Sequence, residues 1–361
     1  MIAIIVGAAV ALLVSMVGTP LFIRFLVKRQ YGQFIRQDGP QSHQVKRGTP
    51  TMGGVVIIAA TVIGWMSASI VMGRPPGMSA ILAVGLMVGL GIVGFLDDYT
   101  KIRKERSLGL SPIAKMIGQG VVGVAFSILV LQFRDQHGRT PASMNISFLR
   151  DTPLNLAHWG TGIGIVLFMI WANFLITAWS NGVNLTDGLD GLATGASLIS
   201  FGAYVLIGLW QFNQDCTSPT ALASTCYQVR DPYDMTIVAA AIAGACCGFL
   251  WWNASPAKIF MGDTGSLALG GAFAAISILT RTEVLAVVIG GLFFIIVMSD
   301  VIQIGFFKMT GKRVFKMAPL HHHFELSGWH EVNVVIRFWV IALLCAAAGL
   351  GLFYGQWVAS S

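Results

Sequence analysis

Residues 78–98 read MSAILAVGLMVGLGIVGFLDD, an apolar run that ends in two aspartates. A helix rises 1.5 Å per residue, so about 20 mainly apolar residues cross the hydrocarbon core of a bilayer. This stretch therefore predicts a transmembrane helix with two acids at one end. Nine other stretches have the same character, and the ten expected spans are residues 4–27, 53–73, 78–96, 113–133, 162–179, 192–210, 235–252, 264–280, 284–307 and 333–354.

The composition of the 361-residue chain excludes an ordinary soluble protein. Hydrophobic residues make up 55% and charged residues only 11%, whereas soluble domains carry roughly 25% charged residues. No internal repeat and no long linker divides the chain. We therefore expect an all-α integral membrane protein in which residues 1–361 form a single polytopic domain.

The basic residues predict the orientation of the spans. Seventeen of the 23 Lys and Arg residues fall in or beside the odd-numbered loops, and the other six, all Arg, fall in the even-numbered loops. Cytoplasmic loops of membrane proteins carry the excess of Lys and Arg. The odd loops are therefore expected in the cytoplasm and both termini outside. The net charge of +7 follows from this bias, and no feature of the sequence suggests nucleic-acid binding.

The polar residues that could carry chemistry gather in the same odd loops. A transporter would instead be expected to place ionisable residues near the bilayer midplane. The clear acid inside a span is Asp300, which lies near the cytoplasmic end of the ninth one. The active site is therefore expected on the cytoplasmic loops, although transport or flipping of a lipid stays an alternative.

Asp97 and Asp98 end the third span, where the negative pole of the helix dipole disfavours carboxylates. Lys101 and Arg103 could neutralise them as a solvated helix end, but two acids placed against the dipole favour a functional role. Asp263, in the segment MGDTGS, begins the eighth span and could simply cap that helix. A helix N-terminus with nearby glycines also suits a phosphate, and Mg²⁺ would be the natural bridge between that phosphate and a carboxylate.

Two further segments look shaped around a ligand. Residues 181–195, NGVNLTDGLDGLATG, contain more Asn, Asp and Gly than one turn requires. Residues 321–323 are three consecutive histidines beside a basic segment, which favours contact with phosphate or sugar over a metal site or a surface cluster. Phe260 could stack on a base or anchor at the membrane interface. Lys46 and Lys115, like the neighbouring Thr51, could belong to the site, but either lysine could equally be part of the general basic bias of these loops.

The five cysteines form neither a CxxC pair nor a zinc-binding pattern. Cys216 and Cys226 share one outer loop and could pair in an oxidising compartment or remain reduced.

Taken together, the segments SHQVKRGTPTMGG, FLDDYTK, NGVNLTDGLDGLA, NASPAKIFMGDTGS and PLHHHFE resemble the polyprenyl-phosphate N-acetylhexosamine-1-phosphate transferases. The first and last segments resemble more narrowly the phospho-N-acetylmuramoyl-pentapeptide transferase branch. The resemblance implies transfer of phospho-MurNAc-pentapeptide from UDP-MurNAc-pentapeptide to undecaprenyl phosphate, giving lipid I and UMP. This Mg²⁺-dependent reaction is the first membrane step of peptidoglycan synthesis, in the bacterial cytoplasmic membrane. A homodimer is a family expectation.

The resemblance also implies roles for individual residues. Asp97, Asp98 and Asp263 would be the catalytic acids, with Asp263 as the metal ligand. The uridine contacts would be Lys46, Gly188, Leu189, Asp190 and Phe260. The diphosphate and sugar contacts would be Asn184, Asp187, Asn253, Gln303, His322 and His323, with Thr51 and Lys115 on the phosphate side.

Two mechanisms remain open at the level of sequence. Asp97 could deprotonate the lipid phosphate for direct attack, which we favour, or Asp263 could act as a covalent nucleophile. A sister transferase that uses UDP-GlcNAc is the alternative activity, and the PLHHHFE segment argues against it.

Overall fold

The computed structural model describes residues 1–29, 31–32, 46, 48–104, 106, 108–217 and 225–360. In this part of the chain, ten helices are long and apolar enough to cross a membrane, as the sequence predicts. The elements are α1 (Ile2–Lys28), α2 (Gly54–Met72), α3 (Met78–Arg103), α4 (Pro112–Leu129), β1 (Asn145–Ser147), β2 (Asp151–Asn155), α5 (Thr161–Thr186), α6 (Leu192–Asn213), α7 (Pro232–Asn253), α8 (Gly262–Leu279), α9 (Leu285–Ile289), α10 (Gly291–Thr310), α11 (Leu320–Glu325) and α12 (Glu331–Ser360).

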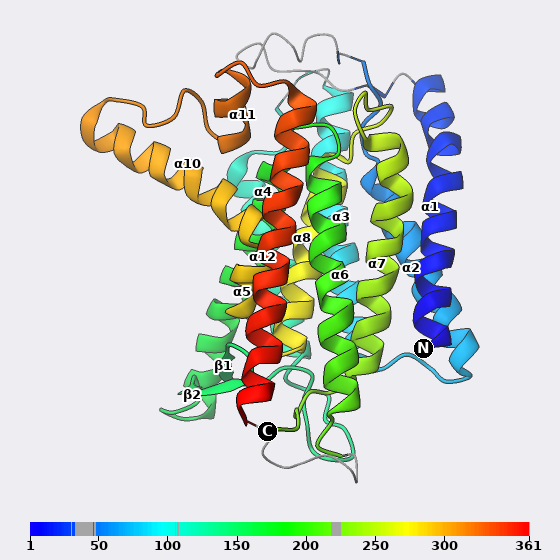
Figure 1. Cartoon of the computed structure of the whole chain (residues 1–361), viewed down its shortest axis with the longest axis vertical. Coiled ribbons are helices and arrows are strands. Elements are labelled where there is room, and N and C mark those ends of the chain that lie inside the picture. Colours follow the sequence, from blue (N-terminus) through cyan, green and yellow to red (C-terminus); the bar gives the residue numbers. More distant parts are fainter. Residues whose placement is uncertain are drawn as a thin grey trace.

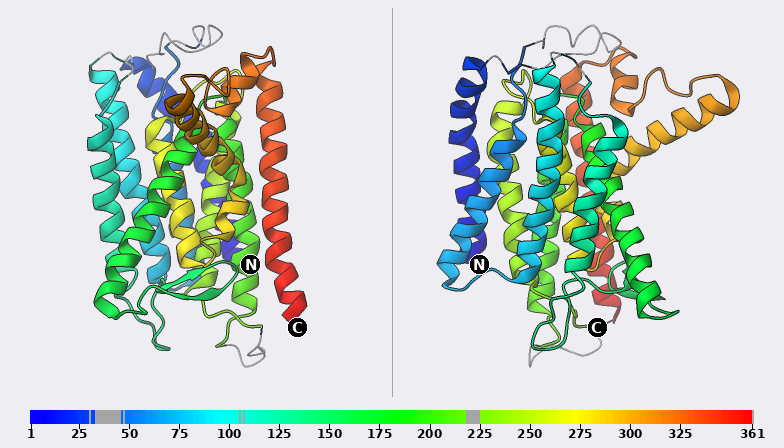
Figure 2. Two further views of the ribbon diagram at one scale, coloured as in Figure 1. Left: turned by 90° about the vertical axis from the view of Figure 1, so that its left-hand side faces the viewer. Right: turned by 180° about the vertical axis from the view of Figure 1, so that it is seen from behind.

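The long helices form one bundle whose two ends differ (Figure 1). Both termini and the β1–β2 hairpin lie at one end, the terminus end, and the short helix α11 lies at the opposite end, the α11 end (Figures 1 and 2). Since the chain crosses the bundle with each long helix, the odd-numbered loops meet at the α11 end. The segments with the unusual polar sequences are therefore brought together.

The ninth expected span differs from the prediction of one helix over residues 284–307. It is broken at Gly290 into the short α9 and the long α10. Two consecutive glycines, Gly290 and Gly291, stand at the break, and glycine is a poor helix former that often marks a sharp kink. Beyond it, α10 leans away from the bundle (Figure 1), so that this side of the α11 end is less enclosed by long helices.

The core of the bundle is α8. Every residue from Thr264 to Leu279 is buried, and most are Ala, Gly, Ser or Leu. Small side chains let α3 and α5 pack closely against it. Phe273 is the one large aromatic side chain of α8, and its ring makes edge contacts with the rings of Trp179 and Tyr204.

Two glycines allow neighbouring helices to approach the first turn of α8. A Cβ atom on Gly54 of α2 would lie 2.0 Å from the backbone nitrogen of Gly265, and one on Gly94 of α3 would lie 2.1 Å from the carbonyl oxygen of Asp263. Any side chain at either position would force the helices apart. The glycines thus place the ends of α2 and α3 directly against Asp263.

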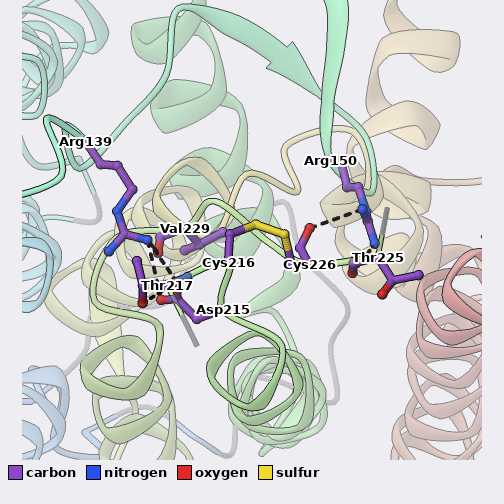
Figure 3. The surroundings of a disulfide bond; sticks show 8 residues. All are labelled: Arg139, Arg150, Asp215, Cys216, Thr217, Thr225, Cys226 and Val229. Carbon is purple, nitrogen blue, oxygen red and sulfur yellow. Dashed lines mark hydrogen bonds and ion pairs between the residues drawn. A yellow bond between two sulfur atoms is a disulfide. The ribbon is translucent and has the colours of Figure 1, made fainter. Parts of the chain in front are cut away.

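At the terminus end, Cys216 and Cys226 form a disulfide (Figure 3). The sequence leaves open whether these two cysteines pair. Arg139 binds the loop on one side through Asp215 and the carbonyl oxygen of Val229. On the other side, Arg150 donates hydrogen bonds to the carbonyl oxygens of Thr225 and Cys226. The disulfide thus closes a loop within the segment between α6 and α7, and the two arginines join that segment to the one after α4.

Candidate active site

Three carboxylates converge at the α11 end of the bundle. The side chains of Asp97, Asp98 and Asp263 offer oxygen atoms that all lie within 4.8 Å of one another, the one such group found among the described residues. Asp97 and Asp98 come from the last turns of α3, and Asp263 comes from the first turn of α8. The structure thus brings together the three acids that the sequence analysis singles out.

Two lysines neutralise the acidic cluster. The Nζ atom of Lys101 lies 2.7 Å from Asp97 Oδ2, 3.1 Å from Asp263 Oδ2 and 3.5 Å from Asp98 Oδ1. Lys115, at the start of α4, places its Nζ atom 2.7 Å from the same Asp263 oxygen. Lys101 was not among the expected site residues. Its spacing of four from Asp97 and three from Asp98 puts all three on one helix face, which is the signal that could have identified it.

The two adjacent aspartates do different things. Asp98 accepts hydrogen bonds from the backbone nitrogens of Asp263 (3.2 Å) and Thr264 (2.9 Å), and from the Thr264 hydroxyl (2.8 Å). It therefore caps α8 from another helix, and the positive N-terminal pole of α8 stabilises its charge. Asp97 accepts one backbone hydrogen bond, from Leu110 at 2.8 Å, besides its contact with Lys101.

Asp263 is not the cap of its own helix. It is the second residue of α8, and the N-cap position, Met261, makes no capping side-chain hydrogen bond. The Asp263 carboxylate instead faces Lys101, Lys115 and the amide of Asn184, whose Nδ2 atom donates to Oδ1 at 2.8 Å. The start of α8 does not need this carboxylate as a cap. Capping therefore does not explain why an aspartate stands at position 263.

The donor set of the cluster fits a hard divalent cation. Carboxylate oxygens from different helices are the ligands that such ions prefer. The Lys101 ammonium group, surrounded by all three carboxylates, shows that the cluster already attracts positive charge to its centre. Asp97, Asp98 and Asp263 are thus the residues that could hold a metal ion.

The segment after α5 lines the next part of the site. Asn184 lies on the last turn of α5 and donates to both Asp263 and Ser266. Burial raises the pKa of Asp187 to about 8, with further increases from the nearby carboxylates of Asp263 and Asp98. A Cβ atom on Gly188 would lie 2.3 Å from His321 Nε2, so this turn packs directly against the histidine segment.

A second charged cluster joins Lys46, Asp190 and Glu331. Lys46 Nζ lies 2.7 Å from Asp190 Oδ1 and 2.6 Å from Glu331 Oε1. The other Asp190 oxygen accepts a hydrogen bond from the backbone nitrogen of Ala257. Glu331, which begins α12, was not expected at the site, because its partners lie far away in the sequence and no local pattern indicates them.

Backbone hydrogen bonds join Phe260 to the end of the first loop. Its nitrogen donates to the carbonyl oxygen of Pro50, and its own carbonyl oxygen accepts from Gly53. The ring is partly exposed. Thr51 and Leu189 are both largely buried, and Thr51 lies close to Gly262. The structure therefore brings the first loop, the turn after α5 and the segment before α8 into contact.

Two residues that are expected to contact the substrate, Asn253 and Gln303, form hydrogen bonds within the protein through their amide groups. Asn253 is buried, accepts from the Thr194 hydroxyl and donates to the carbonyl oxygen of Ile259. Gln303 on α10 binds the backbone of Val314 and Phe315. In this structure both side chains hold loops of the site in place.

The histidine segment forms the short helix α11. His322 Nδ1 lies 2.7 Å from Glu325 Oε2, and His323 Nδ1 accepts a hydrogen bond from the backbone nitrogen of Lys316. His321 is fully buried against Gly188, whereas the other two histidines are partly exposed. His322 and His323 are thus the members of the run that remain accessible at the α11 end.

The comparison with protein families assigns this bundle of membrane-spanning helices to a class of transferases. Residues 80–281, more than half of the chain, match the model described as glycosyl transferase family 4. Residues 46–58 match a second model, phospho-N-acetylmuramoyl-pentapeptide-transferase signature 1.

Full-length relatives narrow the family. The chain is 68% identical to a phospho-N-acetylmuramoyl-pentapeptide-transferase of Beutenbergia cavernae, covering 99% of both chains. It is 60% identical to the protein of that name in Paenarthrobacter aurescens, again with 99% of both chains covered, and 58% identical to that of Streptomyces avermitilis, covering 99% of this chain and 98% of the relative. The chain belongs to the phospho-N-acetylmuramoyl-pentapeptide-transferase family of bacterial multi-pass membrane enzymes.

Proposed function

We propose that the protein transfers phospho-MurNAc-pentapeptide from UDP-MurNAc-pentapeptide to undecaprenyl phosphate, forming lipid I and releasing UMP. The observation that carries this proposal is the convergence of Asp97, Asp98 and Asp263 with two lysines at one end of a membrane bundle. Such a site can bind phosphate groups of a lipid and of a soluble nucleotide at the same membrane surface. Membership of the family supplies the identity of the substrates.

The α11 end is proposed to face the cytoplasm of a bacterial cytoplasmic membrane, with both termini outside. Seventeen of the 23 Lys and Arg residues fall, by sequence, in or beside the odd-numbered loops, and cytoplasmic loops carry such an excess. The Cys216–Cys226 disulfide at the opposite end supports the same orientation, because disulfides persist in oxidising, extracytoplasmic compartments. The nucleotide donor and the inner-leaflet lipid phosphate would then meet at the acidic cluster.

In the proposed reaction, an oxygen of the lipid phosphate attacks the β-phosphorus of the donor. A new bond forms between that phosphorus and the lipid phosphate oxygen, the bond from the β-phosphorus to the bridging oxygen breaks, and UMP leaves with that oxygen. Asp97 is proposed to accept the proton of the lipid phosphate, because its carboxylate belongs to the acidic cluster where that phosphate would bind, with Oδ2 2.7 Å from Lys101 Nζ. Asp98 holds the first turn of α8, and with it Asp263, in position.

Phosphoryl transfer depends mainly on positioning and on stabilising negative charge. Lys101 and Lys115 lie where they can turn from the carboxylates to phosphate oxygens. The proposed metal is Mg²⁺, held principally by Asp263 together with the neighbouring acids, and when bound it would neutralise charge on the diphosphate. Asn184 and Asp187, which lie near Asp263, are proposed to contact the diphosphate and sugar together with the accessible His322 and His323.

The donor nucleoside is proposed to bind at the second cluster. Lys46, Gly188, Leu189 and Asp190 meet there, with the partly exposed ring of Phe260 available to stack on uracil. Thr51 lies between this cluster and the acids, beside Gly262. The two clusters thus offer adjacent places for the base and for the reacting phosphates.

The test is a reconstitution with purified protein in detergent. Incubation with UDP-MurNAc-pentapeptide, undecaprenyl phosphate and Mg²⁺ should yield UMP and a lipid-linked product in equal amounts. A parallel reaction with UDP-GlcNAc examines the sister activity, and omission of Mg²⁺ examines the metal requirement. Lipid-linked product from UDP-GlcNAc alone, or no product from either donor, would contradict the proposal.

A further inference from the structure

One carboxylate at the start of α12 joins three segments that are far apart in the chain. Glu331 Oε1 accepts a hydrogen bond from Lys46 Nζ at 2.6 Å and another from the backbone nitrogen of Asp190 at 3.0 Å. Lys46 is 285 residues away and Asp190 is 141 residues away. Both of these partners belong to the cluster where the donor nucleoside is proposed to bind.

Glu331 holds Lys46 and the backbone of Asp190 in fixed positions relative to α12. Lys46 lies between the carboxylates of Asp190 and Glu331, whose mutual repulsion its charge offsets. The exposed fractions of the three side chains are 19%, 3% and 15% for Lys46, Asp190 and Glu331, so water and salt screen these contacts less than they screen a surface ion pair. The bond to the Asp190 nitrogen fixes the backbone of the turn as well as the side chain above it.

The contacts of Glu331 also link the proposed nucleoside side of the donor site to the proposed sugar and diphosphate side. Only residues 326–330 separate α11, which carries His322 and His323, from Glu331. The nucleoside-side residues Lys46 and Asp190 are therefore fixed to the start of the helix that follows the histidine segment. A change at this carboxylate would alter the distance between the nucleoside and the sugar-phosphate contacts.

We propose that Glu331 is a positioning residue for the nucleotide donor, acting by holding Lys46 and the turn at Asp190. The assignment rests on the proposed function, because it needs the nucleoside to bind at this cluster. Glu331 itself contacts no reacting atom in this arrangement. Its removal should therefore weaken binding of the donor while leaving the chemical step and the lipid acceptor largely unaffected.

The experiment measures steady-state kinetics and donor binding for two variants. Glu331→Gln keeps an oxygen acceptor for the Asp190 nitrogen but removes the charge that pairs with Lys46, and Glu331→Ala removes both contacts. The KM for UDP-MurNAc-pentapeptide should rise about tenfold for E331Q and about 100-fold for E331A, as expected for loss of one and then two charge-assisted hydrogen bonds. The kcat and the KM for undecaprenyl phosphate should stay within about threefold of wild type.

The matched control is Glu283→Gln, because the Glu283 carboxylate also accepts two hydrogen bonds, both from Ser147, but lies towards the terminus end. It should leave the donor KM unchanged. A double-mutant cycle then tests whether Glu331 acts through Lys46. In a Lys46→Met background, Glu331→Gln should change the donor KM by less than about twofold.

The outcomes separate the two proposals. If the wild-type protein forms no lipid-linked product, the proposed function fails, and the assignment of Glu331 fails with it. If the wild type is active but E331Q has the wild-type donor KM, or if kcat falls in place of the rise in KM, only the assignment of Glu331 is overturned. Full additivity of the two substitutions would also overturn it. Should E331A fail to fold, E331Q and its titration with the donor carry the test.

Discussion

Replacing Asp98 with alanine should destabilise the protein far more than replacing its neighbour Asp97 with asparagine. Asp98 accepts two backbone N–H groups and one hydroxyl group at the start of α8, in a buried position. Asp98→Ala leaves these three donors without their acceptor, at roughly 1 kcal/mol or more each. We therefore expect a loss of about 3 kcal/mol in the free energy of unfolding.

Asp97→Asn, in contrast, keeps an oxygen that can accept the Leu110 N–H group and should cost less than about 1 kcal/mol. Both substitutions should remove most of the transfer activity, but for different reasons. Asp97→Asn removes the proposed proton acceptor. Asp98→Ala lets the first turn of α8 shift, and with it the carboxylate of Asp263.

The assay combines thermal unfolding of detergent-purified protein with the transfer reaction. At roughly 2 °C per kcal/mol for a chain of this size, the unfolding midpoint of D98A should fall by about 6 °C and that of D97N by at most about 2 °C. Thr264→Val is the matched control, since it deletes only the hydroxyl donor and should cost about 1 kcal/mol. Equal midpoints for D98A and D97N would refute the capping role of Asp98.

Three other perturbations test separate parts of the structure. Asp263→Asn should abolish product formation with a nearly unchanged unfolding midpoint, because this carboxylate does not cap its helix; near-wild-type turnover would remove it from the chemistry. Phe260→Ala should raise the donor KM more than the KM for undecaprenyl phosphate, and an unchanged donor KM would leave the ring as an interfacial anchor. Burial raises the pKa of Glu283 to about 7, against the hydrogen bonds from Ser147. The folded state therefore holds this proton more tightly than the unfolded state, so ionisation of Glu283 should lower stability as the pH rises from about 4.3 to 7. Glu283→Gln should flatten that part of the pH–stability curve, and identical curves for the two proteins would contradict the effect of burial.

Much of the architecture follows from local composition. Each of the ten spans is recognisable on its own, because the free energy of placing a helix in a bilayer is roughly a sum over the residues of that helix. The break at Gly290 was missed for the same reason: residues 284–307 are apolar throughout, and average hydropathy does not register where two consecutive glycines bend a helix.

The acids of the site could also be identified from the sequence, since Asp97 and Asp98 end an apolar span where the helix dipole disfavours carboxylates. What composition leaves undetermined is how neighbouring acids divide their roles. Asp97 and Asp98 are equivalent in the sequence, yet adjacent side chains on a helix point about 100° apart. Asp98 therefore meets the N-terminus of α8, whereas Asp97 meets Lys101 and Leu110.

The segments that carry chemistry, and the end of the bundle at which they meet, can thus be read from the order of residues, because hydropathy and charge act locally along the chain. Their partners depend on packing. The contacts of Lys46 with Glu331 and of Asp263 with Lys115 form only when the helices pack around the small side chains of α8. Pairings across such distances are a property of the assembled core, and no single segment contains them.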